Sequence, residues 1–97
     1  MREKTKVYEI TYLINPSLTK QEVSNKINYY LNFLIKKGSK AIILKNEKRA
    51  LNYPIKKFES ANYIEMVYSG NGKLVSLLNK EVKRDENVIR NITIKLF

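Results

Sequence analysis

Groups that could perform covalent chemistry are scarce in this chain of 97 residues. It has no cysteine and no histidine, which excludes thiolate nucleophiles, histidine-based triads and zinc sites with Cys or His ligands. Catalysis by a carboxylate pair would need two neighbouring acids with separated pKa values. Glu9 and Glu65 are the only acids inside predicted strands that share an open sheet face, and we interpret both as solvated. The sequence therefore predicts a protein that is not an enzyme and uses no cofactor, metal or small-molecule substrate.

Positive charge is the strongest signal in the composition. Nineteen Lys or Arg residues against nine Asp or Glu residues give a net charge of +10, which favours a polyanionic partner such as nucleic acid. Cations in such a cluster would neutralise phosphates independently of base sequence, although lysines on an edge strand also oppose aggregation. Positions 36–57 contain a single acid, Glu47, and a cluster of cations. These cations are Lys36, Lys37, Lys40, Lys45, Lys48, Arg49, Lys56 and Lys57.

The sequence shows no sign of a membrane or targeting segment. The longest unbroken apolar runs have three or four residues, so we expect no membrane-spanning segment and no membrane partner. Residues 1–6 lack the apolar stretch of a signal peptide, so we expect the protein to act where it is made.

Hydrophobic periodicity predicts the first half of the fold. Residues 6–14 alternate, with apolar side chains at the even positions, as in a strand with one buried face. Thr19 and Glu22 have the spacing of a capping box, and an apolar stripe at helical spacing follows them. Together they predict a helix over 20–37, which Gly38 can end in a left-handed conformation.

The second half is predicted by the same signals. Residues 40–55 form a long strand whose apolar set changes from even to odd positions, which indicates a bulge or distorted segment near 46–50. Pro54 has no N–H to donate, so this strand belongs at a sheet edge. A turn over 56–61 follows. The remaining elements are a strand over 62–69, a helix over 73–84 and a strand over 88–96.

The order β-α-β-β-α-β predicts an α+β fold of the ferredoxin-like, split βαβ kind, as one domain over 1–97. Its four-stranded antiparallel sheet would carry two helices on one face and leave the other face open. We expect the open face to carry Glu9, Thr11, Tyr63, Glu65, Val67, Asn91 and Thr93. RNA-recognition motifs share this topology and stack bases on aromatic residues of the third strand, where this chain has Glu65. We therefore expect RNA contacts at loops and edges instead.

At this point the residues indicate a family. Four stretches resemble the bacterial-type small-subunit ribosomal protein six, in order and over essentially the whole chain: positions 8–18, 48–57 (KRALNYPIKK), 63–66, and 85–96. The second and fourth stretches are the more specific. The resemblance implies a structural constituent of the small ribosomal subunit. Such a protein binds the central domain of small-subunit rRNA as a heterodimer with ribosomal protein eighteen.

The resemblance also implies site residues, position by position. The candidates for RNA binding are Arg2, Lys48, Arg49, Lys56, Lys57 and Arg90. The candidates for the protein partner are Leu51, Tyr53, Pro54 and Phe97. The Lys, Asn and Ile bias with no presequence favours a plastid (chloroplast) ribosome in the stroma; a bacterial cytoplasm is the alternative. A free-standing RNA- or protein-binding regulatory domain on the same fold is the alternative function.

Overall fold

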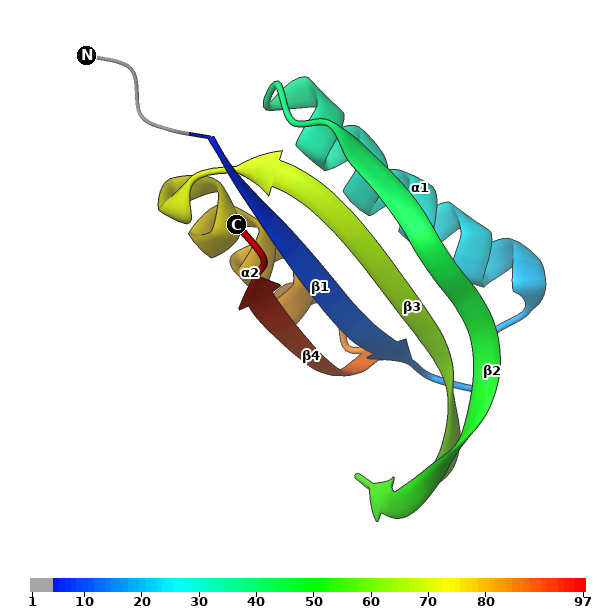
Figure 1. Ribbon diagram of the computed structural model, residues 1–97. Coiled ribbons are helices and arrows are strands. Elements are labelled where there is room, and N and C mark those ends of the chain that lie inside the picture. Colours follow the sequence, from blue (N-terminus) through cyan, green and yellow to red (C-terminus); the bar gives the residue numbers. More distant parts are fainter. Residues whose placement is uncertain (1–4) are drawn as a thin grey trace.

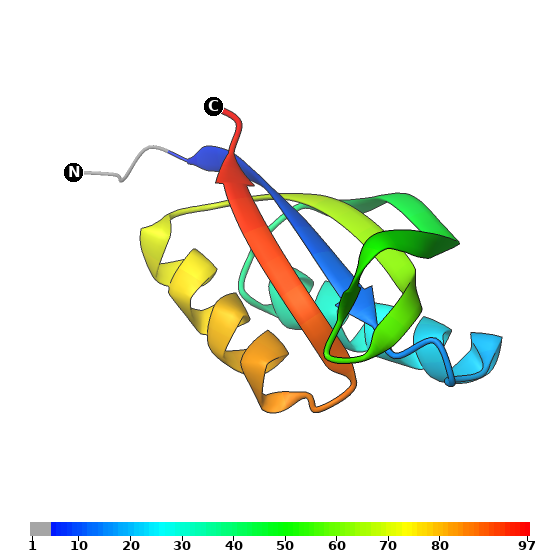
Figure 2. The same cartoon turned by 90° about the horizontal axis from the view of Figure 1, so that it is seen from below.

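The computed structural model describes residues 5–97 and has the predicted order of elements. Its four strands form one antiparallel sheet in the order β2-β3-β1-β4, so β2 and β4 are the edges. Both helices cover the same face of this sheet (Figure 2). The ferredoxin-like arrangement is thus confirmed. The elements, shown in Figure 1, are β1 (Lys6–Ile14), α1 (Lys20–Lys36), β2 (Ala41–Ile55), β3 (Phe58–Gly70), α2 (Gly72–Arg84) and β4 (Val88–Lys95).

The core lies between the sheet and the two helices. The even positions of β1 point into it, as their alternation predicted, and the helical stripes close it from the other side. Each fully buried large apolar side chain contributes roughly 1.5–3 kcal/mol to folding. The largest of them are Tyr12, Tyr30, Tyr68, Ile10, Ile14, Leu34, Ile64, Met66, Leu78 and Val82. Neither helix, within the described part of the chain, is long and apolar enough to cross a membrane.

The start and the end of α1 follow the predicted local signals. Thr19 Oγ1 accepts a hydrogen bond from the Glu22 amide at 3.1 Å, and the Thr19 amide donates to Glu22 Oε1 at 3.0 Å. These bonds satisfy amides that have no partner within the helix, and the Thr19 amide's bond to Glu22 lowers the pKa of that carboxyl. Gly38 closes the helix with a φ of +84°, the left-handed conformation expected of it.

The β2–β3 hairpin differs from the prediction in two places. The register shifts at Leu44 and again over residues 51–54, whereas the predicted distortion near 46–50 is regular in pairing. Residues 51–54 stand opposite the single residue Glu59, so they bulge out of the ladder. The predicted turn over 56–61 is also too long, because β3 already begins at Phe58. The residues at the start of β3 are mostly polar and lack the apolar alternation of a strand, so the sequence did not predict a strand there.

The open face of the sheet, opposite the helices, is more apolar than predicted. Asn91 and Thr93 were expected there, but they pair with Tyr12 and Ile10 and share their helix-facing side. An extra residue, Ile89, interrupts the β1–β4 pairing, and such a bulge moves every later side chain to the other face. The isoleucines that alternate with Asn91 and Thr93 therefore point outward.

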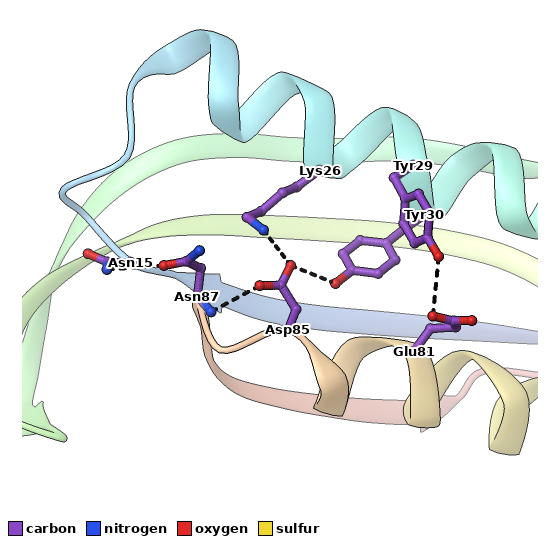
Figure 3. Close-up of polar contacts among 7 residues, drawn as sticks. All are labelled: Asn15, Lys26, Tyr29, Tyr30, Glu81, Asp85 and Asn87. Carbon is purple, nitrogen blue, oxygen red and sulfur yellow. Dashed lines mark hydrogen bonds and ion pairs between the residues drawn. The ribbon is translucent and has the colours of Figure 1, made fainter.

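A polar cluster fastens the loop before β4 to α1 (Figure 3). Asp85 Oδ2 accepts hydrogen bonds from Lys26 Nζ at 2.5 Å and from the Tyr30 hydroxyl at 3.1 Å. Its other oxygen accepts from the Asn87 amide at 2.9 Å. Burial acts to raise the pKa of Asp85, but the bonds from Lys26 and Asn87 outweigh it and lower that pKa. The same loop continues into β4 and so determines where Arg90 lies.

Candidate nucleic-acid interface

The predicted RNA-binding cations gather at one end of the sheet. We call residues 46–62, the distal part of β2 and β3, the hairpin end. Lys48, Arg49, Lys56 and Lys57 belong to it. Arg90 lies in the same cross-strand row, because the row runs Glu47–Tyr63–Leu13–Arg90. Three strand spacings put Arg90 roughly 14 Å from β2. Arg2 lies outside the described residues.

The basic stretch over positions 36–57 is not one cluster in space. Lys36 ends α1, and Lys37 and Lys40 precede β2, so these three cations lie at the opposite end of the strand from Lys56. At the usual rise of a strand, the 15 residues of β2 can span at most about 46 Å, and the longest dimension of the protein is 47 Å. Figure 1 shows this separation along the whole length of the sheet. A single RNA surface at the hairpin end can therefore include only about half of the cations in the predicted basic stretch.

Neighbouring cations on β2 have different surroundings. Arg49 lies on the open-face side, where its Nη2 donates to Glu47 Oε1 at 2.8 Å and its Cζ lies 3.9 Å from the centroid of the Tyr63 ring. The bond to Glu47 raises the pKa of Arg49. Lys48 points to the other side of the strand, is exposed, and forms no ion pair with any residue of 5–97. Lys48 is thus the freer of the two for a phosphate.

The tip of the hairpin presents two lysines in an unusual backbone conformation. Ile55 pairs with Phe58, and the two residues between them, Lys56 and Lys57, have φ values of 49° and 72°. This is the two-residue turn that normally selects Asn-Gly, since L-residues with side chains pay roughly 1–2 kcal/mol in the left-handed region. Both side chains are exposed. The turn holds two adjacent ammonium groups away from the sheet at a measurable conformational cost.

The predicted protein-partner residues divide between the two ends of the molecule. Leu51, Tyr53 and Pro54 lie in the bulged segment of the hairpin, where Tyr53 is 81% exposed. Phe97 is 79% exposed and lies at the other end, where its carbonyl accepts from the Val7 amide at 3.4 Å. The structure does not bring these four side chains into one patch. A partner that reaches both groups must extend along the sheet.

The two acids predicted for the open face do not stand directly opposite each other. Glu9 pairs with Val67, whereas Glu65 pairs with Thr11, so the two acids are offset by two residues on adjacent strands. Glu65 accepts a hydrogen bond from the Tyr63 hydroxyl at 3.2 Å. Among residues 5–97, no three acidic side chains gather as metal ligands would. Arg49 covers the ring of Tyr63, which the register places on this face.

Sequence reasoning missed the exposed isoleucines of β4. Ile92 is 58% exposed and Ile94 is 50% exposed, and both lie on the open face. The available signal was the pair of adjacent apolar residues Val88 and Ile89, both of which are buried. Two consecutive buried positions cannot occur in a regular two-residue alternation, so they mark the bulge that reverses the faces.

Comparison with known proteins gives consistent matches. The family model described as "Ribosomal protein S6" matches residues 7–95. "Small ribosomal subunit protein bS6c" of Guillardia theta is 37% identical over 91 residues, which are 93% of this chain and 95% of the relative. "Small ribosomal subunit protein bS6" of Gloeothece citriformis is 39% identical over 95% of this chain, but only 53% of the relative is covered.

A solved structure supports the fold independently. The crystal structure of 30S ribosomal protein S6 from Thermotoga maritima matches with a TM-score of 0.85 at 22% sequence identity. The match covers 97% of this chain and 90% of the solved one. At this identity the likeness shows the shared fold of sheet and helices.

Proposed function

Because the chain belongs to the ribosomal protein S6 family, we propose that it binds the central domain of small-subunit rRNA together with ribosomal protein eighteen. The family is a structural and non-enzymatic component of the small ribosomal subunit. The single observation that carries the proposal is the family match over residues 7–95. The cationic hairpin end supports it, because clustered Lys and Arg side chains bind phosphates and release counterions.

The RNA-binding residues of the proposal are Lys48, Lys56, Lys57 and Arg90, with Arg49 in a secondary role. All four are exposed, and Lys48, Lys56 and Lys57 belong to the hairpin end, whereas Arg90 lies on the opposite edge strand. Arg49 already neutralises Glu47 and stacks on Tyr63, so it would help to orient the surface more than to bind a phosphate. Arg2 stays in the proposal on its sequence position alone.

The protein-partner residues of the proposal are Leu51, Tyr53, Pro54 and Phe97. Their support is the exposure of two large aromatic side chains, Tyr53 and Phe97, at the two ends of the molecule. Residues 51–54 lie outside the regular β2–β3 register, and an extended segment could pair with this bulged edge.

Binding to a central-domain rRNA fragment, with and without ribosomal protein eighteen and across a salt series, tests the proposal. Tight binding that requires the partner supports it. Equally weak, salt-sensitive binding to any RNA, whether or not the partner is present, contradicts it, because net charge alone would then explain the interaction. Failure to co-sediment with small subunits in high salt would favour the free-standing regulatory domain.

We further propose a plastid ribosome as the location. The relative of Guillardia theta carries the plastid-type name bS6c and matches over nearly its entire length. The bS6 relative of Gloeothece citriformis is equally similar in identity, so a bacterial cytoplasm is the alternative. Mass spectrometry of small subunits purified from isolated plastids decides between the two locations. If the plastid location is right, peptides of this protein are present in those subunits and absent from other compartments.

A further inference from the structure

A second group of cations lies at the end of the sheet away from the hairpin. Lys36 ends α1, Lys37 follows it, Lys40 precedes β2, and Lys73 lies in the first turn of α2. We call these four residues the lysine end. All four are exposed, and Figure 1 shows the end of α1 and the beginning of α2 far from the hairpin tip. The surface proposed for the hairpin end leaves these four cations without a role.

A hollow at the lysine end is large enough to hold a ligand. It has a volume of about 390 Å³, within the range of roughly 300–1,000 Å³ that ligand pockets occupy. Lys37 lines it from the end of α1, and Lys73 lines it from the beginning of α2. Gly38 and Gly70 also line it and bring no side chains, so part of its wall is bare backbone. Two lysines from different helices thus share one hollow.

The positive charge of the lysine end has no counter-charge in the described part of the chain. No acid of residues 5–97 lines the hollow, and none forms an ion pair with the four lysines. The acids of the helices lie toward the other end, with Glu22 in the first turn of α1 and Glu81 in the second half of α2. Lys37 Nζ lies 5.9 Å from the centroid of the Phe33 ring, which is a contact without a negative charge. An anion that binds here would relieve the repulsion among these lysines.

The chemistry of the lysine end fits the phosphate groups of an RNA backbone. Lysine binds phosphate as a point charge, and such contacts do not depend on base sequence. The longest dimension of the protein is 47 Å, and the lysine end and the hairpin tip lie at its two ends. A phosphate held in the hollow is therefore separated from one held at Lys57 by most of this length. We expect the two ends to hold different stretches of RNA.

We propose that the lysine end binds the phosphate backbone of a second stretch of RNA, with one phosphate group in the hollow between Lys37 and Lys73. Lys40 stands beside the hollow, because its amide donates to Ser69 Oγ at 3.0 Å and Ser69 lines the hollow. Lys40 and Lys36 would contact the neighbouring phosphates. This inference rests on the proposed rRNA binding at the hairpin end and extends it, because one chain would then connect two stretches of RNA.

NMR spectroscopy of the isotopically labelled full chain observes the two ends separately. The probe is a short oligouridylate, which carries backbone phosphates in a uniform sequence. Its titration should shift the amide signals of Gly38 and Gly70 at the hollow. The double variant Lys37→Gln with Lys73→Gln should weaken the affinity reported by these signals at least fivefold. It should also reduce the salt slope of that affinity by about 1.4 units, because two phosphate contacts to a single strand are lost.

The matched control is the variant Lys80→Gln with Lys83→Gln. Both residues are exposed and lie farther along α2, so the control loses the same charge at a distance from the hollow. Lys80 lies roughly 10 Å along the helix from Lys73. The affinity at the hollow should stay within twofold of the original in this control. Thermal unfolding of each variant confirms that it is folded.

Other outcomes would overturn the inference in distinguishable ways. If the oligouridylate shifts only signals of the hairpin end, the inference is wrong while the proposed function stands. If it shifts signals at neither end, the inference is wrong, and the proposed function fails too if the central-domain fragment does not bind.

Three further results would assign the lysine end to something else and would each overturn the inference. Equal shifts with inorganic phosphate, at the same phosphate concentration, would show a site for the free anion. Weaker binding of the central-domain fragment by the double variant would show that both ends hold one stretch of RNA. Co-sedimentation with phosphatidylglycerol vesicles, lost in the double variant, would show a membrane-binding surface.

Discussion

The guanidinium carbon of Arg49 lies 3.9 Å from the centroid of the Tyr63 ring, on the open face of the hairpin end. A cation over an aromatic face is attracted by the ring. In this contact the Arg49 guanidinium is no longer a free cation, and the Tyr63 ring is no longer a free stacking surface. The adjacent cation, Lys48, lies on the other side of the strand and has no such contact among residues 5–97. Two consecutive basic residues therefore have different surroundings.

Lys48→Ala should weaken RNA binding and reduce the slope of log K against log salt by about one unit, because one phosphate contact is lost. Arg49→Ala should change that slope by less, since Glu47 already neutralises much of the Arg49 charge. Filter binding to the central-domain fragment at several salt concentrations measures both slopes. Lys36→Ala, an exposed cation at the other end of the molecule, should leave the slope unchanged. An equal loss for Lys36 and Lys48 would show that binding has no preferred end.

Lys57→Gly should stabilise the protein by about 1 kcal/mol, because glycine adopts the positive φ of this turn position without strain. The same variant should reduce the salt slope of RNA binding by about one unit. Urea unfolding measures the stability, with Lys48→Gly as the control. In the extended conformation at position 48, glycine should destabilise by roughly 0.5–1 kcal/mol. A Lys57→Gly protein that unfolds at lower urea than the original would contradict the strained turn.

Asp85→Asn should lower the free energy of unfolding by about 2 kcal/mol near neutral pH, because hydrogen bonds to the charged carboxylate are lost. The folded state lowers the pKa of Asp85. Its contribution is therefore complete above the unfolded-state value of about 3.9 and disappears as the pH falls through the folded-state value. Urea unfolding from pH 7 to pH 2 should show the two curves converging in acid. Glu86→Gln, an exposed neighbour, should run parallel to the original throughout.

Tyr12→Phe and Tyr30→Phe should have opposite effects on stability. The Tyr12 hydroxyl is buried without a hydrogen-bond partner among residues 5–97, and burial raises its pKa. Removing it should stabilise the protein by about 1 kcal/mol, since an unpaired buried hydroxyl is unfavourable. The Tyr30 hydroxyl donates to Asp85, so its removal should destabilise the protein by about 1–2 kcal/mol. The rings contact each other edge to face, so one thermal unfolding experiment compares matched sites. Destabilisation by both substitutions would disprove the difference.

Local signals in the sequence determined most of the secondary structure. The capping box at Thr19 and Glu22 acts within four residues of chain, and the alternation in residues 6–14 needs only a sheet to lie against. The order of elements then selects the split βαβ topology, because few connections of these lengths are allowed. The edge position of β2 followed from the topology and agrees with Pro54.

Only the tertiary structure decided which side chains lie together on each surface of the protein. Alternation says which residues of β4 share a face, but the bulge at Ile89 decides that Ile92 and Ile94 point outward. The separation of Lys36 from Lys56 depends on β2 running as one strand along the length of the sheet. Contacts such as Arg49 over Tyr63 join different strands, and their register is determined by long-range pairing. The sequence by itself thus determined the family, the fold and the basic character of this protein, whereas cross-strand register decided which of its cations are free and which side chains of β4 lie on the open face.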